Sequence, residues 1–368
     1  MNQRNPKSKL LLGPGPSNTD PRVLRALSEP TLGHLDPEFV AIMDETTELL
    51  RYVFNTKNKL TIPVSGTGSA GMETAIVNSV EPGDKAIICT AGVFGERMVD
   101  VTERAGAQVV KVESPWGEPI DPEDVKKAIR KNPDAKILGI VHAETSTGVL
   151  QPLDEIAAMV HEAGMRIVVD AVTSLGGVDV PTDRLQLDFV YSGTQKCLSC
   201  PPGLAPITLG EKAFEFIQNR KTKCQSWYLD LGMIQRYWGS ERFYHHTAPI
   251  NMIYALNEAL RIIKEEGLEA RIKRHKAAQE ALISGLAALG LKPVVNEPYR
   301  LPSLTTVYVP EGINEAAVRK QLLDEFGIEI GAGLGVFKGK VWRIGMMGTN
   351  ANRANVIRLL GALKDILG

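Results

Sequence analysis

The chain has 368 residues, of which 43% are hydrophobic and 23% are charged, and its formal net charge is −1. This length allows two domains with substantial cores, whereas the balanced charge does not indicate nucleic acid or an anionic membrane as a partner. No run of about 18 apolar residues occurs, and neither a signal peptide nor a Ser-Lys-Leu address is recognisable, so we expect a cytoplasmic protein.

The sequence begins with a segment rich in glycine and proline, which includes Gly13-Pro-Gly-Pro16. Glycine lets the backbone approach closely and proline fixes φ, so residues 1–20 are predicted to form an irregular extended arm. A plain N-terminal tail is the alternative. Helices are predicted over residues 21–27 and 37–54, the second because its apolar residues recur at helical spacing.

A turn of small residues, Ser65-Gly-Thr-Gly-Ser-Ala-Gly71, separates a predicted strand over 60–64 from a predicted helix over 72–80. In this arrangement free backbone N–H groups and the helix dipole point at one place, which favours an anion. The turn lacks the lysine of a nucleotide P-loop and the complete Gly-x-Gly-x-x-Gly of a dinucleotide fold. We therefore expect Gly68 and Ser69 to hold the phosphate of a different cofactor.

Strands and helices alternate along the next part of the chain. The strands are short, apolar and rich in valine and isoleucine, which predicts an α/β fold with a mostly parallel sheet and helices on both faces. His142 ends one of the strands and is interpreted as structural rather than catalytic. Strands are predicted over 85–89, 107–112, 137–141, 165–170 and 205–209, and helices over 121–132 and 154–163.

Asp170 ends one apolar strand, and Lys196 follows another after Ser192-Gly-Thr-Gln195. Ser69, Thr145, Asp170 and Lys196 all come just after strands, and open α/β sheets bind ligands at that carboxyl edge. The pair suggests an aldehyde-bearing cofactor, with Lys196 bound to the aldehyde as a Schiff base and Asp170 holding a pyridinium nitrogen protonated. The alternative is that Asp170 caps the next element and Lys196 is a solvated loop residue.

Two residue pairs raise the possibility of a metal or redox site. Cys197 and Cys200 have the spacing of half a motif, but no second pair lies nearby, and four cysteines in the chain are too few for a disulfide framework. His245 and His246 are adjacent, and in an extended segment they would point to opposite faces. We therefore predict no metal site.

From about residue 268 the alternation of helices and strands changes. We predict a large domain over 21–267 and a smaller α+β domain over 268–368. Arg343 lies on a predicted strand of the smaller domain and is either a surface ion-pair residue or buried; a buried arginine needs an anion, and its planar fork suits a carboxylate. Helices are predicted over 249–266, 268–289, 314–326 and 352–367, and strands over 303–309, 328–335 and 340–344.

These residues resemble a known family over nearly the whole chain. The segment Leu11-Leu-Gly-Pro-Gly-Pro-Ser-Asn18, the Asp170 and Lys196 pair, and Arg343-Ile-Gly-Met-Met-Gly348 are similar to the fold-type I class V aminotransferases, which depend on pyridoxal phosphate. Within that family the chain resembles the alanine–glyoxylate and serine–pyruvate aminotransferase group. The resemblance implies a homodimer with pyridoxal 5′-phosphate as cofactor.

The resemblance also implies roles for individual residues. Phe94 would stack on the cofactor ring, where the family often has tryptophan, and Tyr244 and Thr247 would reach the active site of the partner subunit. Arg343 would bind the substrate α-carboxylate, with Gly15 on the arm beside the substrate. The cofactor contacts implied in one subunit or its partner are Thr67, Gly68, Ser69, Phe94, Thr145, Asp170, Val172, Gln195, Lys196, Tyr244 and Thr247.

The implied reaction is transamination of a small amino acid, alanine or serine, with glyoxylate or pyruvate as the acceptor. (S)-Ureidoglycine is an alternative donor, because near relatives in the family use other amines. A cysteine desulfurase of the same fold needs a nucleophilic thiol in the second domain, and no cysteine follows Cys224. A non-catalytic subunit of the same fold is disfavoured because Lys196 and Asp170 are both present.

Overall fold

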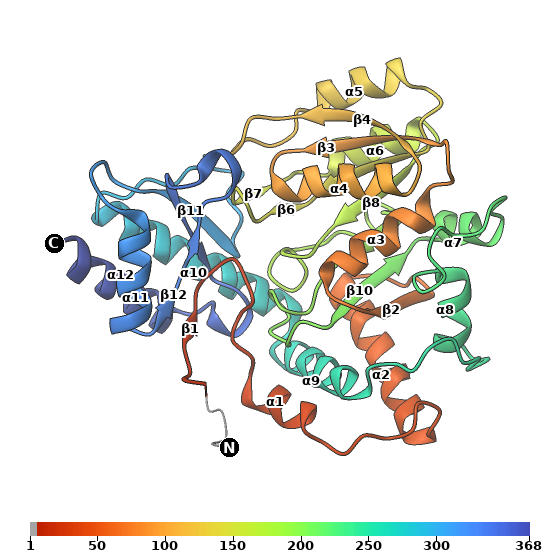
Figure 1. Cartoon of the computed structure of the whole chain (residues 1–368), viewed down its shortest axis with the longest axis horizontal. Coiled ribbons are helices and arrows are strands. Elements are labelled where there is room, and N and C mark those ends of the chain that lie inside the picture. Colours follow the sequence, from red (N-terminus) through yellow and green to blue (C-terminus); the bar gives the residue numbers. More distant parts are fainter. Residues whose placement is uncertain (1–5) are drawn as a thin grey trace.

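The computed structural model describes residues 6–368, and its centre is a seven-stranded sheet with helices on both faces (Figure 1). The strand order is β2-β10-β9-β8-β5-β3-β4, and only β10 runs antiparallel to its neighbours. The predicted α/β class with a mostly parallel sheet is confirmed. The strands are β2 (Leu60–Ser65), β3 (Lys85–Thr90), β4 (Gln108–Glu113), β5 (Ile137–Val141), β8 (Arg166–Asp170), β9 (Phe189–Tyr191) and β10 (Leu204–Leu209).

Local signals in the sequence explain where several helices begin. Asp20, Asp36 and Asp121 each precede a proline, and each carboxylate accepts a hydrogen bond from the amide two residues on, so they cap α1, α2 and α5. Helices α3 and α4 pack beside each other on the sheet. Helices α5 and α6 also contact each other, with α5 against β3 and β4 and α6 against β8 (Figure 1). The helices up to the end of this part are α1 (Pro21–Leu27), α2 (Pro37–Phe54), α3 (Gly68–Ser79), α4 (Val93–Arg104), α5 (Pro122–Lys131), α6 (Asp154–Glu162), α7 (Glu211–Gln218), α8 (Leu231–Trp238) and α9 (Ile250–Glu266).

The sheet topology brings Lys196 to the same edge as Asp170. Strand β8 is the middle strand, and Asp170 is its last residue, paired with Tyr191 at the end of the parallel strand β9. Because β10 returns antiparallel to β9, the connection over residues 192–203 turns at the carboxyl edge of the sheet. Lys196 lies in that connection, so strand direction alone places it beside the carboxyl ends of β8 and β9.

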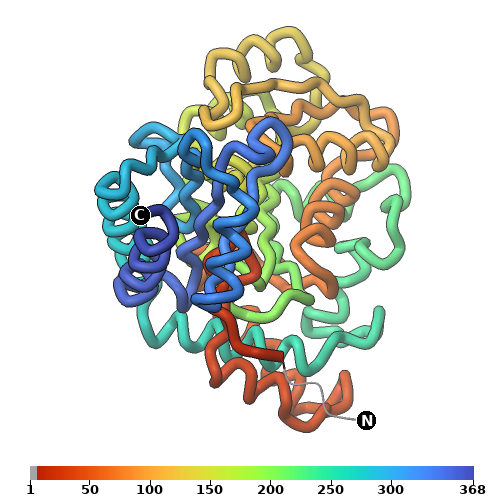
Figure 2. Tube along the Cα trace, turned by 60° about the vertical axis from the view of Figure 1, so that its left-hand side comes forward, coloured from red at the N-terminus to blue at the C-terminus, as the bar shows by residue number. Residues whose placement is uncertain are grey.

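The C-terminal part contains the remaining helices and two small sheets. Strands β11, β14 and β13 form an antiparallel sheet, and the arm strand β1 pairs in parallel with β12, so the N-terminal arm runs along the C-terminal part (Figures 1 and 2). The elements here are β1 (Leu10–Leu11), α10 (Leu268–Ala288), β11 (Leu304–Tyr308), α11 (Glu315–Glu325), β12 (Ile328–Glu329), β13 (Gly331–Ala332), β14 (Val341–Gly345) and α12 (Arg353–Leu367).

Buried apolar side chains form two main clusters. One extends from Val23 to Ile263 in sequence, and the other joins Leu12 of the arm to residues 278–363. A small third cluster contains residues from both parts of the chain, among them Cys197, Leu301 and Met347. The division into domains at residue 268 stays a prediction, since α10 contacts elements of both parts.

Some predicted elements differ from the structure. Helix α3 begins at Gly68 rather than at residue 72, because the small residues of the expected turn pack closely: a Cβ on Gly71 would lie 3.0 Å from the Cβ of Ala205. The strand expected over 328–335 is split into β12 and β13 and followed by a 3-10 turn, Gly335–Phe337. A Cβ on Gly333 would lie 2.1 Å from the carbonyl oxygen of Phe337, so the chain folds back on itself there. The short helices α7 and α8 and the hairpin of β6 (Ala143–Glu144) with β7 (Val149–Leu150) were not predicted.

Within residues 6–368, none of the helices combines the length and the apolar character that crossing a membrane requires. The cytoplasmic location stays a prediction.

Candidate active site

Asp170 is a buried carboxylate with two hydrogen-bond donors. The amide of Val172 donates to Oδ1 and the phenol of Tyr191 donates to Oδ2, both at 2.8 Å. Burial raises the pKa of Asp170 to about 6, while the two hydrogen bonds and the positive charge of Lys196 oppose that rise. Asp170 is therefore not a solvated helix cap, and its donors favour the ionised form.

Lys196 is buried as well, with 8% of its surface exposed. Burial, together with the positive charge of Arg343, lowers the pKa of its amine to about 8. Its Nζ donates a hydrogen bond to the carbonyl oxygen of Pro14. The interpretation of Lys196 as a solvated loop residue is thus wrong, because its side chain is buried. The lowered pKa also means that a larger fraction of the amine is neutral at a given pH than in water.

The N-terminal arm is in direct contact with the lysine and is not a free tail. Gly15 has φ of +104°, and a Cβ at this position would lie 2.5 Å from Nζ of Lys196. The hydroxyl of Ser17 donates to the carbonyl oxygen of Lys196 at 2.8 Å, and its amide donates to that of Gln195. The arm therefore closes one side of the lysine and fixes its backbone.

The predicted phosphate turn lies against the Asp170 strand. Thr67 is the N-cap of the 12-residue helix α3, and within residues 6–368 the amides of Gly68 and Ser69 have no hydrogen-bond acceptor. A Cβ on Gly68 would lie 3.3 Å from Cγ2 of Val172, so this turn and the residues after Asp170 are in contact. Free amides at the start of a helix are donors suited to an anion.

Arg97 joins this turn to Phe94. Its Nη1 lies 3.4 Å from the hydroxyl oxygen of Ser69, and its guanidinium carbon lies 4.9 Å from the centre of the Phe94 ring. Phe94 is half-buried at the start of α4. The structure thus places Ser69 and Phe94 on either side of one arginine that the sequence analysis did not select.

Arg343 is buried on β14 of the small antiparallel sheet. Its Nε donates to the carbonyl oxygen of Ala332 at 2.7 Å, and its Nη1 donates to that of Thr145 at 3.1 Å. Burial lowers the pKa of its guanidinium to about 10, with the carboxylate of Glu144 opposing the change. It remains charged at neutral pH, and it is held by carbonyl groups rather than by a carboxylate, so it is not a surface ion-pair residue.

Tyr244 and Thr247 form no hydrogen bond with these residues within residues 6–368, although Nε2 of His246 between them lies 2.8 Å from the hydroxyl oxygen of Ser65, just before the phosphate turn. Both are exposed, and the tyrosine hydroxyl lies 3.2 Å from the hydroxyl oxygen of Thr247. Between them, the Nδ1 atoms of His245 and His246 are only 2.8 Å apart, so the expectation that these rings point to opposite faces is wrong. The reason is that the segment bends and forms no strand, which removes the alternation of an extended chain.

The other candidates have structural surroundings. His142 is buried, and burial lowers its pKa to about 4. Cys197 and Cys200 are buried, and burial raises the pKa of both thiols. Within residues 6–368 no group of three His, Cys, Asp or Glu side chains could hold a metal ion.

Sequence reasoning missed Tyr191, Glu144 and the backbone oxygen of Pro14. Tyr191 had one visible signal, since it ends an apolar run just as Asp170 does. Glu144 lies next to the predicted Thr145 but has partners about 50 residues upstream. Neither partner set can be inferred without the strand register.

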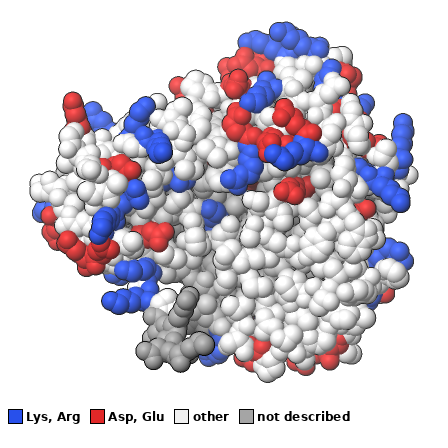
Figure 3. Space-filling model, viewed as in Figure 1, with Lys and Arg blue, Asp and Glu red and all other residues white. Residues whose placement is uncertain are grey.

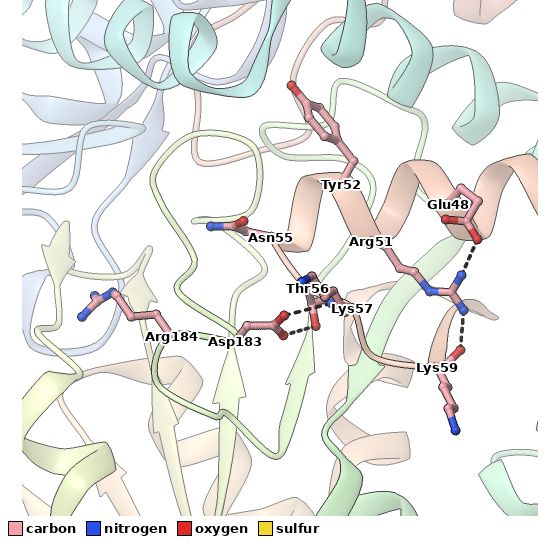
Figure 4. Close-up of a pocket in the computed structure, with 9 residues that line it drawn as sticks. All are labelled: Glu48, Arg51, Tyr52, Asn55, Thr56, Lys57, Lys59, Asp183 and Arg184. Atoms are coloured by element: carbon pink, nitrogen blue, oxygen red, sulfur yellow. Dashed lines mark hydrogen bonds and ion pairs between the residues drawn. The ribbon is translucent and has the colours of Figure 1, made fainter.

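A hollow of about 810 Å³ on the surface lies away from these residues (Figure 4). It is lined by residues around the end of α2 and the segment that leads into the start of β2, which is the opposite edge of the sheet from Lys196. Its charged side chains contact nearby groups: Arg51 pairs with Glu48, and Asp183 accepts from Thr56 and the amide of Lys57. The hollow is therefore separate from the candidate site.

Comparison with known proteins decides what this arrangement belongs to. The family model described as aminotransferase class-V matches residues 10–358. The chain belongs to the class-V aminotransferase family. It is an enzyme of the fold-type I group whose cofactor is pyridoxal phosphate.

Three relatives of this class-V aminotransferase show how far the likeness extends. Alanine–glyoxylate aminotransferase of Rattus norvegicus is 43% identical over 363 residues, which cover 98% of this chain and 87% of the relative. (S)-Ureidoglycine–glyoxylate transaminase of Bacillus subtilis is 40% identical over 377 residues, covering 98% and 90%. The crystal structure of alanine–glyoxylate aminotransferase from Nostoc sp. superposes with a TM-score of 0.98 at 49% identity, covering 100% of this chain and 97% of that one.

The residues of this class-V aminotransferase fit its cofactor. The free amides of Gly68 and Ser69 suit a phosphate, the buried Asp170 suits a protonated ring nitrogen, and the partly neutral Lys196 suits an aldehyde. In addition, Oε1 of Gln195 is buried with no hydrogen-bond partner within residues 6–368. An orphaned buried acceptor at this place is consistent with a bound group that supplies a donor.

Proposed function

We propose that this class-V aminotransferase transfers the amino group of a small amino acid, alanine or serine, to glyoxylate or pyruvate. The observation that carries the proposal is the buried Lys196, whose amine donates to the carbonyl oxygen of Pro14 and whose pKa is shifted by the charges of Asp170 and Arg343. Two of the relatives described above are named for alanine and glyoxylate, which supports this substrate pair. The arm at Pro14 and Gly15 crowds Lys196, which favours a short substrate side chain.

Each residue has a defined task in this proposal. Pyridoxal phosphate, when bound, supplies an aldehyde that exchanges amines and a ring that withdraws electrons from the substrate Cα. Lys196 Nζ, with its pKa lowered to about 8, would remove the proton from the substrate Cα as general base and would deliver it, as general acid, to the cofactor carbon that carried the aldehyde. Asp170 stabilises the protonated ring nitrogen, and Arg343 binds the α-carboxylate with its planar fork.

The proposed cofactor contacts are Thr67, Gly68, Ser69, Phe94, Thr145, Val172 and Gln195, in addition to Asp170 and Lys196. Gly15 is proposed to lie beside the substrate, because it is in contact with Lys196.

We also propose a homodimer in which Tyr244 and Thr247 reach the partner's site. Large apolar side chains are exposed near this segment, with Trp227, Phe243 and Tyr244 exposed by 60%, 54% and 50%. Exposed aromatic residues in such number favour a protein interface. In Figure 3 charged side chains are sparse over the part of the face that carries α2, α3 and β2.

(S)-Ureidoglycine is the second candidate donor. The Bacillus subtilis relative named for that substrate matches this chain almost as well as the alanine–glyoxylate relative from rat does, at 40% against 43% identity. Both donors have an α-amino group and an α-carboxylate, so Arg343 would bind the carboxylate and Lys196 would remove the Cα proton in either case. They differ in the group on Cα, so a direct comparison of turnover separates them.

The visible absorption of the purified holoenzyme tests the proposal. L-Alanine, L-serine, (S)-ureidoglycine and L-aspartate are added one at a time, and glyoxylate is added afterwards. Bleaching by alanine or serine, reversed by glyoxylate, is the expected result. Bleaching by ureidoglycine alone would select the second donor, and a coloured protein that no amine bleaches would indicate a non-catalytic subunit.

The variant Lys196→Ala tests the role of the lysine in the same assay. It is expected to lose transamination and to keep its fold, as judged by far-ultraviolet circular dichroism. Lys127→Ala, a change of an exposed lysine on α5, serves as the matched control. Wild-type turnover by Lys196→Ala would show that the assigned mechanism is wrong.

A further inference from the structure

Glu144 is a buried carboxylate of the candidate site, and it has no task of its own in the proposed reaction. It ends β6, and only 2% of its surface is exposed. Its Oε2 accepts hydrogen bonds from the amides of Phe94 at 3.1 Å and Gly95 at 3.3 Å, and its Oε1 accepts from the amide and the hydroxyl of Ser146 at 3.0 and 2.6 Å. Within residues 6–368 it forms no ion pair, so backbone and hydroxyl donors alone compensate its burial.

The carboxylate replaces the missing cap of helix α4. The N-cap residue of this 12-residue helix is Gly92, which has no side chain to accept from the free amides. The amides of Phe94 and Gly95 bind Glu144 instead, and the amide of Val93 donates to the Ser146 hydroxyl at 3.0 Å. The segment around Glu144 thus accepts from three successive amides, and the negative charge lies at the positive end of the helix dipole.

Glycine at position 92 is what lets the two segments meet. A Cβ there would lie 2.3 Å from the hydroxyl oxygen of Ser146 and 2.6 Å from Cγ of Glu144. Any other residue would push the start of α4 away from the hairpin. The hairpin of β6 and β7 therefore holds Phe94 in position, through the hydrogen bonds to Glu144 and the close approach at Gly92.

The same hairpin also holds Arg343. Thr145 lies between Glu144 and Ser146 in sequence, and its carbonyl oxygen accepts from Nη1 of Arg343 at 3.1 Å. The bonds from Glu144 to Ser146 close a tight loop around Thr145 and so fix the direction of that carbonyl. One carboxylate consequently determines the position of the proposed ring-stacking residue and of the proposed carboxylate-binding residue.

We propose that Glu144 is a positioning residue that couples cofactor binding to substrate-carboxylate binding, by holding Phe94 and the Thr145–Arg343 contact in one rigid unit. This inference rests on the proposed roles of Phe94 and Arg343. Electrostatics act in the same direction, because the carboxylate of Glu144 favours the charged form of Arg343. Replacing the carboxylate by an amide of equal shape turns one acceptor into a donor and so repels an amide or hydroxyl that now binds there.

The test is the variant Glu144→Gln in the full chain, with two equilibrium measurements and one spectrum. The first is the dissociation constant of pyridoxal phosphate from the apoenzyme, and the second is that of propanoate, a carboxylate without an amino group, from the holoenzyme. Both are expected to rise about tenfold, the effect of losing a hydrogen bond to a charged group. The visible circular dichroism of the bound cofactor is expected to change as well, since it reports how the ring is held.

Glu96→Gln is the matched control, because Glu96 is also in the first turn of α4 but points outward and pairs with Lys111 at 2.6 Å. It is expected to leave both dissociation constants and the spectrum unchanged. If Glu144→Gln does not fold, Ser146→Ala removes the hydroxyl between Val93 and Glu144 and is expected to change both constants in the same direction.

The outcomes separate this inference from the proposed function. Lower thermal stability with both constants unchanged would reduce Glu144 to a structural residue and overturn the inference. A change in only one constant would overturn the coupling. Failure of the wild-type apoenzyme to bind pyridoxal phosphate at all would instead reject the proposed function.

Discussion

The phenol of Tyr191 donates a 2.8 Å hydrogen bond to Oδ2 of Asp170, from the last residue of one parallel strand to the last residue of its neighbour. This bond favours the ionised carboxylate and so opposes burial, which nevertheless raises the pKa of Asp170 to about 6. Tyr191 is itself fully buried, and burial beside Asp170 raises the pKa of its phenol, so it stays a donor throughout the physiological range.

The variant Tyr191→Phe is therefore expected to raise the pKa of Asp170 above its present value. Loss of one hydrogen bond to a charged group corresponds to a rise of about one unit in the pKa of Asp170, from its present value of about 6. At pH 7 the ionised fraction of the carboxylate then falls by about half, so kcat should fall about twofold. The acidic limb of the pH profile of kcat should move to higher pH, and activity should recover partly as the pH rises.

Tyr254→Phe is the control for this change. Tyr254 is also buried, and its hydroxyl bonds to the backbone of Pro30 and Leu32 rather than to a carboxylate; it lies on α9, outside the site. It should lower stability slightly without moving the acidic limb. An acidic limb of Tyr191→Phe that coincides with that of the wild type would show that Tyr191 does not tune Asp170.

The sequence was sufficient to place Asp170, Lys196 and the Gly68–Ser69 turn at one edge of the sheet, because strand ends can be recognised from apolar runs and parallel strands end together. The same reasoning could not identify Tyr191 as the partner of Asp170. That contact depends on the register between β8 and β9, and a shift of one residue would turn the side chain to the opposite face.

Glu144 shows a second limit of the sequence. Its role depends on a helix start about 50 residues away, because the start of α4 at Val93 determines which amides are free. The arm contact of Pro14 with Lys196 is a long-range contact of the same kind. Such contacts are set by tertiary packing, which local spacing does not encode.

Lys196 gives a prediction about the pH dependence of stability. Burial lowers its pKa from 10.5 to about 8 in the folded protein, so between these values the unfolded chain binds more protons than the folded one. The free energy of unfolding must then rise with pH across this window, since below about pH 8 folding carries the cost of a buried ammonium group. The total change expected from this residue is about 3 kcal/mol.

The measurement is urea unfolding of the apoprotein from pH 7 to pH 10.5, for the wild type and for Lys196→Met. Other groups contribute equally to both proteins, so the difference isolates the lysine. The stability of the wild type should increase relative to the variant as the pH rises. A difference that does not vary with pH would mean that Lys196 is not buried as an amine in the folded apoprotein.

Arg343 leads to a prediction about substrate affinity. Arg343→Lys keeps a positive charge but loses the planar fork, so only one hydrogen bond to an α-carboxylate can form. KM for the amino donor should rise by about 10- to 100-fold, the value of one charge-assisted hydrogen bond, with a smaller effect on kcat. Arg319→Lys, on α11 beside Glu315, is the control and should leave KM unchanged. An unaltered KM in Arg343→Lys would exclude Arg343 as the carboxylate ligand.

Arg271 is expected to be the most sensitive position for stability on helix α10. It is 2% exposed, and it donates to the carbonyl oxygens of Cys197 at 2.7 Å and Gly176 at 3.2 Å while pairing with Glu266 at 2.7 Å. It thus fixes the chain just after both Lys196 and the Asp170 strand. Arg271→Met leaves two buried carbonyls without this donor and removes a partly buried ion pair, so that within residues 6–368 Glu266 keeps only its pair with Arg274.

The expected loss is about 3 kcal/mol in the free energy of unfolding, which is typical when one partner of a buried charged network is removed. Lys273→Met on the same helix is the matched control, because its pair with Glu269 is exposed and should contribute less than about 1 kcal/mol. Both variants are compared with the wild type by urea unfolding of the apoprotein. Equal stability of the two variants would show that α10 does not stabilise the Lys196 segment through Arg271.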